Sequence, residues 1–401
     1  MWTFSQSITS ISAQDHKPNI LVISRTFFPN QGGIQEYAYN RCLQDPKSVI
    51  VLSSACADDG KFDQIQTFPI YRWPMPPPGL FGLLGGILKQ ILNMFWSVVL
   101  GIRLYQRYHY RYIEWCHGYD FPALLLLSYL LPIECFIYLH GDDVLCPLKN
   151  PFFRWLFEWT LQRSKIIVCN SSFTQNYLKE NFEVERPIQI IHPTVRPEKF
   201  GQVSLKQKNI LRSQIRQKYQ IPQDAIVILS VGRLVRRKGF DRVIEHLPAL
   251  LADGLDVYYL ICGRGQMESE LRELSEKLGV ASRVIFAGYV PDEELASYYA
   301  TCDIFSMLTF FDNKQKSIEG FGIVYLEAGY FGKPVIASRV GGVEDAVLHG
   351  ETGLLVDPNS PKEILSMLRQ MCTDRELREK LGNRGQELAT RNTPHRMLYM
   401  T

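Results

Sequence analysis

The sequence lacks the cysteine spacing of a zinc site or a disulfide scaffold. Its nine cysteines are scattered along the chain, and none of them forms a CxxC pair. Structural zinc sites and small disulfide-linked domains depend on such paired spacing, so both classes are excluded. We expect reduced, buried thiols, which favour a cytoplasmic protein.

A large net charge and an apolar leader are also missing. Lys and Arg number 44 against 41 Asp and Glu, which leaves a net charge of only +3. That balance excludes a basic coat for nucleic acid, so no nucleic-acid partner is expected. Residues 1–17 are polar and mixed, without the apolar core of a secretory signal. We expect a cytoplasmic location, with any membrane contact peripheral and on the inner face.

The chain contains two successive series of short apolar runs that alternate with amphipathic stretches. The runs of each series are rich in Val and Ile, as in strands buried on both faces of a parallel sheet. This pattern predicts two doubly wound α/β domains, residues 1–196 and 197–379, with a ligand site in a cleft between them. We expect the remaining segment, 380–401, to pack back on the first domain.

The segment EGFGIVYLEA, Glu319 to Ala328, combines a glycine pair with two acidic residues. A helix is expected to start near Gly322, where free backbone N–H groups attract an anion. Glu327 inside that helix suits a ribose diol, and Glu319 before it suits sugar hydroxyls. The alternative is that Glu327 only complements the helix dipole while Glu319 is solvated.

A basic loop, SVGRLVRRKGF, follows the first strand of the second series. Arg233 and Lys238 at this position suit a diphosphate. We assign Arg236 and Arg237 to the surface. The alternative is a solvated basic loop without a ligand.

Three features of the first domain also lie at expected strand ends. Gly32–Gly33 allows close approach of a phosphate, although plain turn chemistry explains most such pairs. His140 in YLHGDD would point into the cleft, either to bond a sugar hydroxyl or as a structural histidine. Asp142 and Asp143 look like a Mg²⁺ pair. We expect no required metal, because Lys, Arg and helix N–H groups already supply the countercharge.

Taken in order, the motifs resemble the retaining glycosyltransferases of family 4, which have the GT-B fold. The series comprises the Gly-Gly loop, HGDD, GRLVRRKG, CGRG, GYVPDEEL, EGFGIVYLEA and GGVEDAVLHGETGLLVDP. Seven residues separate Glu319 from Glu327, as in the family's signature. The resemblance is nearly continuous from Ile226 to Pro358 and patchy in the first domain.

The resemblance implies transfer of a hexose from a nucleotide-diphosphate sugar, of the GDP-mannose or UDP-glucose/UDP-GlcNAc type. The acceptor would be lipid-linked, a saccharide or a small molecule, and no metal or other cofactor would be needed. Residues matching the family's motifs would then fall into three groups: catalytic His140, Arg233, Lys238 and Glu319; donor-binding Gly32, Gly33, Gly263, Val290, Phe321, Gly322, Ile323 and Glu327; and Asp142 on the acceptor side.

Residues 79–112 suggest contact with an anionic membrane surface. Lys89 is the only charge between Gly79 and Ile102, and small or polar residues recur there at helical spacing. Arginines interleaved with tyrosines follow, a combination suited to anionic lipids. The alternative, equally open, is a helix packed on its own domain and followed by a solvated basic turn.

Other classes of protein remain as alternatives to a transferase. A nucleotide-sugar sensor would keep the diphosphate residues without turnover, and a UDP-sugar epimerase would share the two-domain fold. A nicotinamide dehydrogenase ranks far below them. CGRGQ matches GxGxxG poorly, and no acidic ribose ligand follows at the expected distance.

Overall fold

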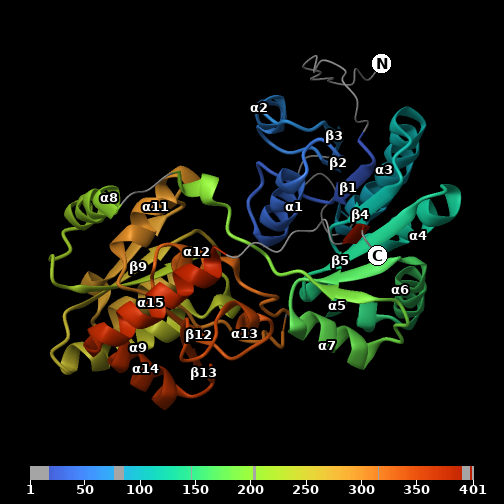
Figure 1. Ribbon diagram of the computed structural model, residues 1–401. Coiled ribbons are helices and arrows are strands. Elements are labelled where there is room, and N and C mark those ends of the chain that lie inside the picture. Colours follow the sequence, from blue (N-terminus) through green and yellow to red (C-terminus); the bar gives the residue numbers. More distant parts are fainter. Residues whose placement is uncertain are drawn as a thin grey trace. The chain divides into compact units, whose positions relative to one another are not determined.

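A computed structural model describes residues 18–75, 85–145, 147–201, 205–314, 316–390 and 398–399. The chain divides into two compact units (Figure 1). The first unit is Met1–His192 with Thr393–Thr401, and the second is Pro193–Asn392. Each unit is built around one parallel sheet with helices on both faces, so the predicted α/β architecture is confirmed.

The first unit contains a seven-stranded sheet in the order β3-β2-β1-β4-β5-β6-β7, with every neighbouring pair parallel. Its central strands are buried on both faces, which explains their unbroken apolar runs. The strands are β1 Ile20–Ser24, β2 Val49–Ser54, β3 Ile70–Trp73, β4 Tyr112–Trp115, β5 Glu134–Leu139, β6 Ile166–Cys169 and β7 Ile188–Ile190.

The helices of the first unit cover the two faces of this sheet. Helices α3, α4, α6 and α7 pack on one face, and α1 packs on the other. The helices are α1 Gly33–Gln44, α2 Asp59–Gln64, α3 Gly85–Tyr108, α4 Phe121–Leu130, α5 Asp142–Leu145, α6 Pro151–Arg163 and α7 Ser172–Asn181.

The second unit contains a six-stranded parallel sheet in the order β10-β9-β8-β11-β12-β13. Because the strands are parallel, their carboxyl ends share one edge, where ligands of such sheets bind. The strands are β8 Ile226–Val231, β9 Val257–Cys262, β10 Val284–Gly288, β11 Ile304–Met307, β12 Val335–Ser338 and β13 Gly353–Val356.

Helices α8, α11, α12 and α15 pack mainly on one face of the second sheet, and α9, α10 and α14 on the other. The helices are α8 Leu205–Lys218, α9 Phe240–Ala252, α10 Glu268–Lys277, α11 Asp292–Thr301, α12 Ile323–Tyr330, α13 Val343–Ala346, α14 Pro361–Thr373 and α15 Arg375–Ala389. Short 3₁₀ turns lie at η2 Pro147–Lys149, η3 Pro197–Phe200, η4 Arg236–Lys238 and η5 Ala281–Arg283.

The end of the chain contributes to both units. Helix α15 packs against α12 in the second unit, where a Cβ atom on Gly329 would lie only 2.8 Å from the carbonyl oxygen of Gly385. Leu398 and Tyr399 belong to the first unit, where Leu398 is buried and the Tyr399 hydroxyl accepts a hydrogen bond from Arg41 (3.1 Å). Within 380–401, residues 391–397 and 400–401 lie outside the described part of the chain.

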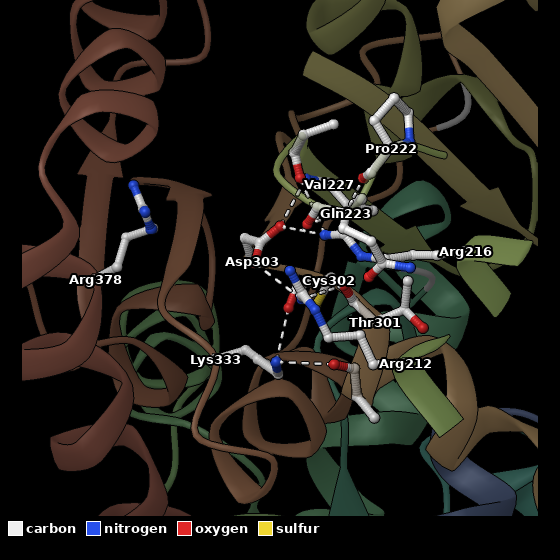
Figure 2. A network of polar contacts seen from close by, with 12 residues as sticks. Arg212, Arg216, Pro222, Gln223, Val227, Thr301, Cys302, Asp303, Lys333 and Arg378 are labelled. Atoms are coloured by element: carbon white, nitrogen blue, oxygen red, sulfur yellow. Dashed lines mark hydrogen bonds and ion pairs between the residues drawn. The ribbon is translucent and has the colours of Figure 1, made fainter. Parts of the chain in front are cut away.

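A polar network anchors α8 at the edge of the second sheet opposite the expected ligand edge (Figure 2). Asp303 accepts hydrogen bonds from Arg212 (3.0 Å), Arg216 (3.0 Å) and the backbone N–H of Val227 (2.9 Å). Lys333 donates to the carbonyl oxygen of Cys302 (2.7 Å). The Arg216 side chain is fully buried, so this charge depends on Asp303 and on the carbonyls around it.

A buried ion pair joins α1 to β4 in the first unit, and we expect the free energy of unfolding of this unit to depend on it. The Arg41 and Glu114 side chains are 2% and 0% exposed and are joined at 2.7 Å. Glu114→Gln would leave a buried guanidinium without its counterion, so unfolding should become easier by about 3–5 kcal/mol. Residues 193–392 contain no tryptophan, so tryptophan fluorescence during urea unfolding does not report on the second unit.

Asp58→Asn is the matched control, because Asp58 and Lys61 form an exposed pair in the same unit. It should change stability by less than about 1 kcal/mol. Equal effects of the two substitutions would contradict a structural role for the buried pair.

Candidate functional site

The predicted donor residues of the second unit follow the carboxyl ends of β8, β9, β10 and β11, either in the loops there or in helix α12. Backbone hydrogen bonds join these loops to one another. The Gly263 N–H donates to the carbonyl oxygen of Gly288 (2.7 Å), and the Phe310 N–H donates to that of Arg237 (2.9 Å). The loops therefore form one connected surface at the ligand edge of the sheet.

Two glycines allow these loops to approach so closely. Gly263 has φ of +146°, and a Cβ atom there would lie 1.8 Å from the carbonyl oxygen of Gly232. Gly239 has φ of +68°, and its Cβ atom would lie 1.9 Å from the carbonyl oxygen of Leu308. No larger residue fits at either position, and Lys238 is thereby held against the loop that follows β11.

Lys238 and Glu319 form the central ion pair of this surface. The Lys238 Nζ donates to Glu319 Oε2 at 2.6 Å, and Arg237 Nη1 donates to the same oxygen at 2.9 Å. Burial alone would raise the pKa of Glu319, but the two cations outweigh it and hold the pKa at about 2. Burial also lowers the pKa of Lys238, against the attraction of Glu319.

The placement of Arg237 corrects the sequence analysis, which assigned it to the surface. Its side chain is only 12% exposed and is turned toward Glu319. Arg236 and Arg233 are exposed, and Arg233 is close enough to lower the pKa of Lys238. Successive residues of a 3₁₀ turn point in directions about 120° apart, so neighbouring arginines need not share an environment. The site thus holds two cations, Arg237 and Lys238, on one carboxylate, with the exposed Arg233 near Lys238.

Helix α12 begins beside this ion pair. Gly322 precedes it with φ of +93°, and a Cβ atom there would lie 2.4 Å from the Tyr325 ring. The Tyr325 hydroxyl donates to the carbonyl oxygen of Met307 (2.9 Å), which ties the helix start to the end of β11. The Tyr325 N–H donates to the Gly322 carbonyl oxygen (3.1 Å), while the N–H groups of Ile323 and Val324 come before the first hydrogen bond of the helix. Phe321 is buried in the core of the second unit, so its ring is not available to a ligand.

Glu327 is more completely paired than the sequence suggests. It is 3% exposed, and its two oxygens accept hydrogen bonds from Lys199 (2.7 Å) and Tyr299 (2.7 Å). A carboxylate offers about four lone-pair positions, so two positions remain after these bonds. Val290, which was expected near the base, is buried in the core cluster that also contains Leu326 and Ala328, the neighbours of Glu327. Lys199 and Tyr299 were missed because no sequence spacing links them to Glu327.

His140 in the first unit has a defined hydrogen-bonding state. Its Nε2 lies 3.0 Å from the Cys116 carbonyl oxygen, which can only accept, so Nε2 carries the proton. Burial lowers the pKa of His140 despite the nearby carboxylate of Asp143, and the ring is therefore neutral. Its Nδ1 is then an acceptor suited to a hydroxyl group.

The two adjacent aspartates have different environments. Asp143 is buried and accepts hydrogen bonds from the backbone N–H groups of Gly118 (2.7 Å) and His140 (2.8 Å). It therefore holds the β4 and β5 ends together. Asp142 is half-buried at the start of α5. Within the described ranges, no group of three or more His, Cys, Asp or Glu side chains could hold a metal ion.

Gly32 and Gly33 are exposed at the start of α1. A Cβ atom on Gly33 would meet nothing within 4 Å, so its backbone is open to a ligand. The Glu36 N–H already donates to the Gly32 carbonyl (2.9 Å), while the N–H groups of the first turn lack helical partners. The expectation that these residues and the second unit's site face one cleft remains a prediction.

The ion pair at Glu319 makes stability depend on pH in a defined direction. Because its folded-state pKa is depressed from 4.5 to about 2, its stabilising effect is complete above about pH 5 and is lost as pH falls toward 2. Glu319→Gln should therefore destabilise the second unit near neutral pH, and the difference from the unmodified protein should shrink on acidification. Scanning calorimetry across this range measures it. A difference that stays constant from about pH 6 to about pH 3 would contradict the assigned pKa.

Known proteins share both halves of this chain's sequence. Residues 212–388 match the family described as Glycosyl transferases group 1, and residues 32–199 match Glycosyltransferase Family 4. A GDP-mannose-dependent alpha-(1-6)-phosphatidylinositol monomannoside mannosyltransferase of Mycobacterium tuberculosis is 29% identical over 254 residues, which is 63% of each chain. A GDP-mannose-dependent monoacylated alpha-(1-6)-phosphatidylinositol monomannoside mannosyltransferase of Corynebacterium glutamicum is 27% identical over 91% of each chain.

Solved structures agree with the fold. Anabaena HepE in complex with UDP and glucose superposes with a TM-score of 0.74 at 20% identity, covering 93% of this chain and 95% of that one. Sucrose-phosphate synthase from Thermosynechococcus elongatus gives 0.75 at 20% identity, covering 93% and 94%. Together, the two family matches and the two parallel-sheet units show that the chain belongs to the family 4 (group 1) glycosyltransferases and has the GT-B fold.

Proposed function

We propose that the protein transfers a hexose from a nucleotide-diphosphate sugar to an acceptor, with retention of anomeric configuration and without a metal. The observation that carries the proposal is the pairing of Arg237 and Lys238 with Glu319 beside the first turn of α12, with Arg233 near Lys238. Cations and free N–H groups at one place suit a diphosphate, and a carboxylate among them suits sugar hydroxyls.

Donor and acceptor are proposed from the relatives. The mycobacterial and corynebacterial relatives are named as GDP-mannose-dependent enzymes acting on phosphatidylinositol mannosides. We therefore favour GDP-mannose over a UDP-sugar and a lipid-linked acceptor over a free saccharide. The eight cysteines of the described residues are free thiols, which supports a cytoplasmic location.

Lys238 would change partner when the donor binds. In the structure it is held by Glu319, and a diphosphate beside it would offer a second anion of higher charge. Glu319 would then turn its free lone pairs to the hydroxyls of the sugar. Negative charge grows on the leaving diphosphate in the transition state, so a preorganised ammonium there stabilises the transition state more than the ground state.

The proposed chemistry needs no enzyme nucleophile. The bond from the anomeric carbon to the diphosphate oxygen breaks, and the acceptor oxygen bonds to the same face of that carbon. The acceptor proton passes to the leaving phosphate oxygen, which balances the charge. Neutral His140, with Nδ1 as an acceptor, would position a donor hydroxyl, and Asp142 would lie on the acceptor side.

Glu327 would hold the ribose through its two remaining lone-pair positions. Lys199 and Tyr299 each donate a hydrogen bond to the carboxylate, so its orientation is set before the nucleotide arrives. The backbone N–H groups of Gly33 and Ile323 would bind phosphate oxygens, and the loop of Gly263 and Val290 would receive the base.

Selective stabilisation by one nucleoside diphosphate tests the donor site. With EDTA present, GDP or UDP at about 100 times its dissociation constant should stabilise the protein by about 2.7 kcal/mol, an easily measured thermal shift. The proposal fails if no diphosphate shifts the melting temperature, or if NAD alone does. Binding without hexose transfer to any lipid, saccharide or small-molecule acceptor would indicate a sensor, and conversion of the donor sugar without an acceptor would indicate an epimerase.

Lys238→Met should lower turnover by about 10²–10³-fold, and binding by less, because the charge acts mainly on the leaving group. Arg236→Met is the matched control, since Arg236 is exposed in the same turn and should leave turnover unchanged. Equal turnover of the two variants would remove Lys238 from the mechanism.

Glu327→Gln should weaken binding of the nucleoside diphosphate by about tenfold or more, because the ribose hydroxyls lose a charged acceptor. Titration calorimetry with inorganic diphosphate is the internal control. That ligand has no ribose, so its affinity should not change. A parallel loss for both ligands would mean that the substitution disturbs the whole site and not the ribose contact.

A further inference from the structure

Large apolar side chains are exposed on three neighbouring helices of the first unit. Among the described residues, nine of the fifteen exposed large hydrophobic side chains lie on α3, α4 and α6. Helix α4 contacts both α3 and α6, and the three lie side by side in Figure 1. We call the exposed rings the aromatic face: Phe95 on α3, Tyr129 on α4, and Phe152, Phe153, Trp155 and Trp159 on α6.

The aromatic face is continuous across α4 and α6. Trp159 lies 6.0 Å from Tyr129 and 5.1 Å from Trp155, measured between ring centroids. Phe152 lies 6.0 Å from Trp155. These six side chains are between 39% and 62% exposed, whereas Phe157 of the same helix is fully buried in the core. The core therefore does not account for the exposed rings.

The later part of the polar stripe of α3 faces inward, whereas Gly86 and Lys89 are exposed. Asn93 and Ser97 are buried, and Asn93 Oδ1 accepts a hydrogen bond from the Trp73 indole (3.0 Å). Gly101 lies against Leu127 of α4, and its carbonyl oxygen accepts a hydrogen bond from the Tyr110 hydroxyl. Phe95 is left facing outward. Membrane contact and packing on its own domain were the two interpretations of this segment. They are compatible, because α3 packs on its own domain and still exposes apolar side chains. Residues 79–84 lie outside the described ranges.

Charge on these helices is strongly one-sided. They carry a single acidic residue, Glu158, which is paired with Arg154 at 3.3 Å. The guanidinium of Arg163 lies over the Tyr129 ring, 4.5 Å from its centroid. Their basic residues are Lys89, Arg103, Arg107, Arg154 and Arg163.

We propose that the aromatic face is a docking surface for an anionic lipid bilayer. Tryptophan, tyrosine and phenylalanine rings suit the headgroup level of a membrane, where one side is apolar and the other wet. Arg163 beside Tyr129 and the exposed arginines of α3 and α6 complement lipid phosphates, and they outnumber the two acidic side chains near the rings, Glu158, which is paired with Arg154, and the exposed Glu183. Among the described residues, the helices include none with the length and hydrophobicity of a membrane span.

Docking rests on the exposed side chains and not on the transfer reaction, although it would bring the proposed enzyme to a lipid-linked acceptor. The two can therefore fail separately. Nucleoside diphosphate binding in solution tests the donor site, and vesicle binding without nucleotide tests the aromatic face.

The experiment is sedimentation of the full chain with phosphatidylcholine vesicles, with and without phosphatidylglycerol. Binding should require the anionic lipid, and it should weaken at high salt. Brominated lipid should quench tryptophan fluorescence, because Trp155 and Trp159 would lie in the contact. No binding to anionic vesicles at low salt would overturn the proposal.

Two sets of substitutions separate the contributions. The triple variant Phe152→Ser, Trp155→Ser and Trp159→Ser should lose about tenfold or more in partitioning. Arg103→Ser with Arg107→Ser should lose roughly fivefold for each arginine removed. Ile65→Ser is the control, since Ile65 is exposed elsewhere in the same unit and should bind as the unmodified protein does.

Unchanged melting temperature and nucleotide response in the triple variant show that it is folded. Undiminished vesicle binding by that variant would overturn the proposal. So would a stable dimer of the unmodified protein that the triple variant converts to monomer, since a second copy would then be the occupant of the aromatic face.

Discussion

The ion pair between Lys238 and Glu319 is the interaction on which the candidate site depends. It joins the loop after β8 to the loop that leads into α12, and both side chains are almost removed from water. A buried pair of this kind is costly unless its geometry is fixed, because desolvation opposes the attraction. The glycines at 239 and 263 supply the fixed geometry by allowing backbone loops to touch where no side chain would fit.

The same arrangement links stability to ligand binding. Two cations converge on one carboxylate oxygen, which leaves the cluster with surplus positive charge at the start of a helix. An anionic ligand can relieve that surplus, so the donor would complete an electrostatic arrangement that is already in place. Glu327 follows the same principle, since Lys199 and Tyr299 hold its charge in position before any ribose is present.

Much of this could be predicted from the sequence, because parallel strands and their loops leave local signals. Apolar runs such as those at 226–231 and 257–262 predict strands buried on both faces, and the glycines and charges that follow mark the loops. What the sequence did not predict depends on contacts between distant segments. Lys199 donates a hydrogen bond to Glu327, which lies 128 positions later in the sequence. Arg236 and Arg237 are the same residue type, but Arg236 is exposed whereas Arg237 points toward Glu319.

The exposed rings of α6 illustrate the same limit. In sequence, PFFRWLFEWTLQR mixes aromatic with charged residues, and residue type alone does not separate the buried Phe157 from the exposed Trp155. Only the packing of α4 and the sheet decides which rings are left outside.

The most direct test of metal-independent hexose transfer is an assay in EDTA with labelled GDP-mannose and UDP-glucose as donors. The acceptors are phosphatidylinositol mannoside-type lipids, and NMR identifies the anomer of the product. The account predicts transfer from one donor only, release of its nucleoside diphosphate, and an α-linked product. A folded protein that binds neither donor, transfers only when a divalent metal is restored, or forms a β-linked product would contradict it.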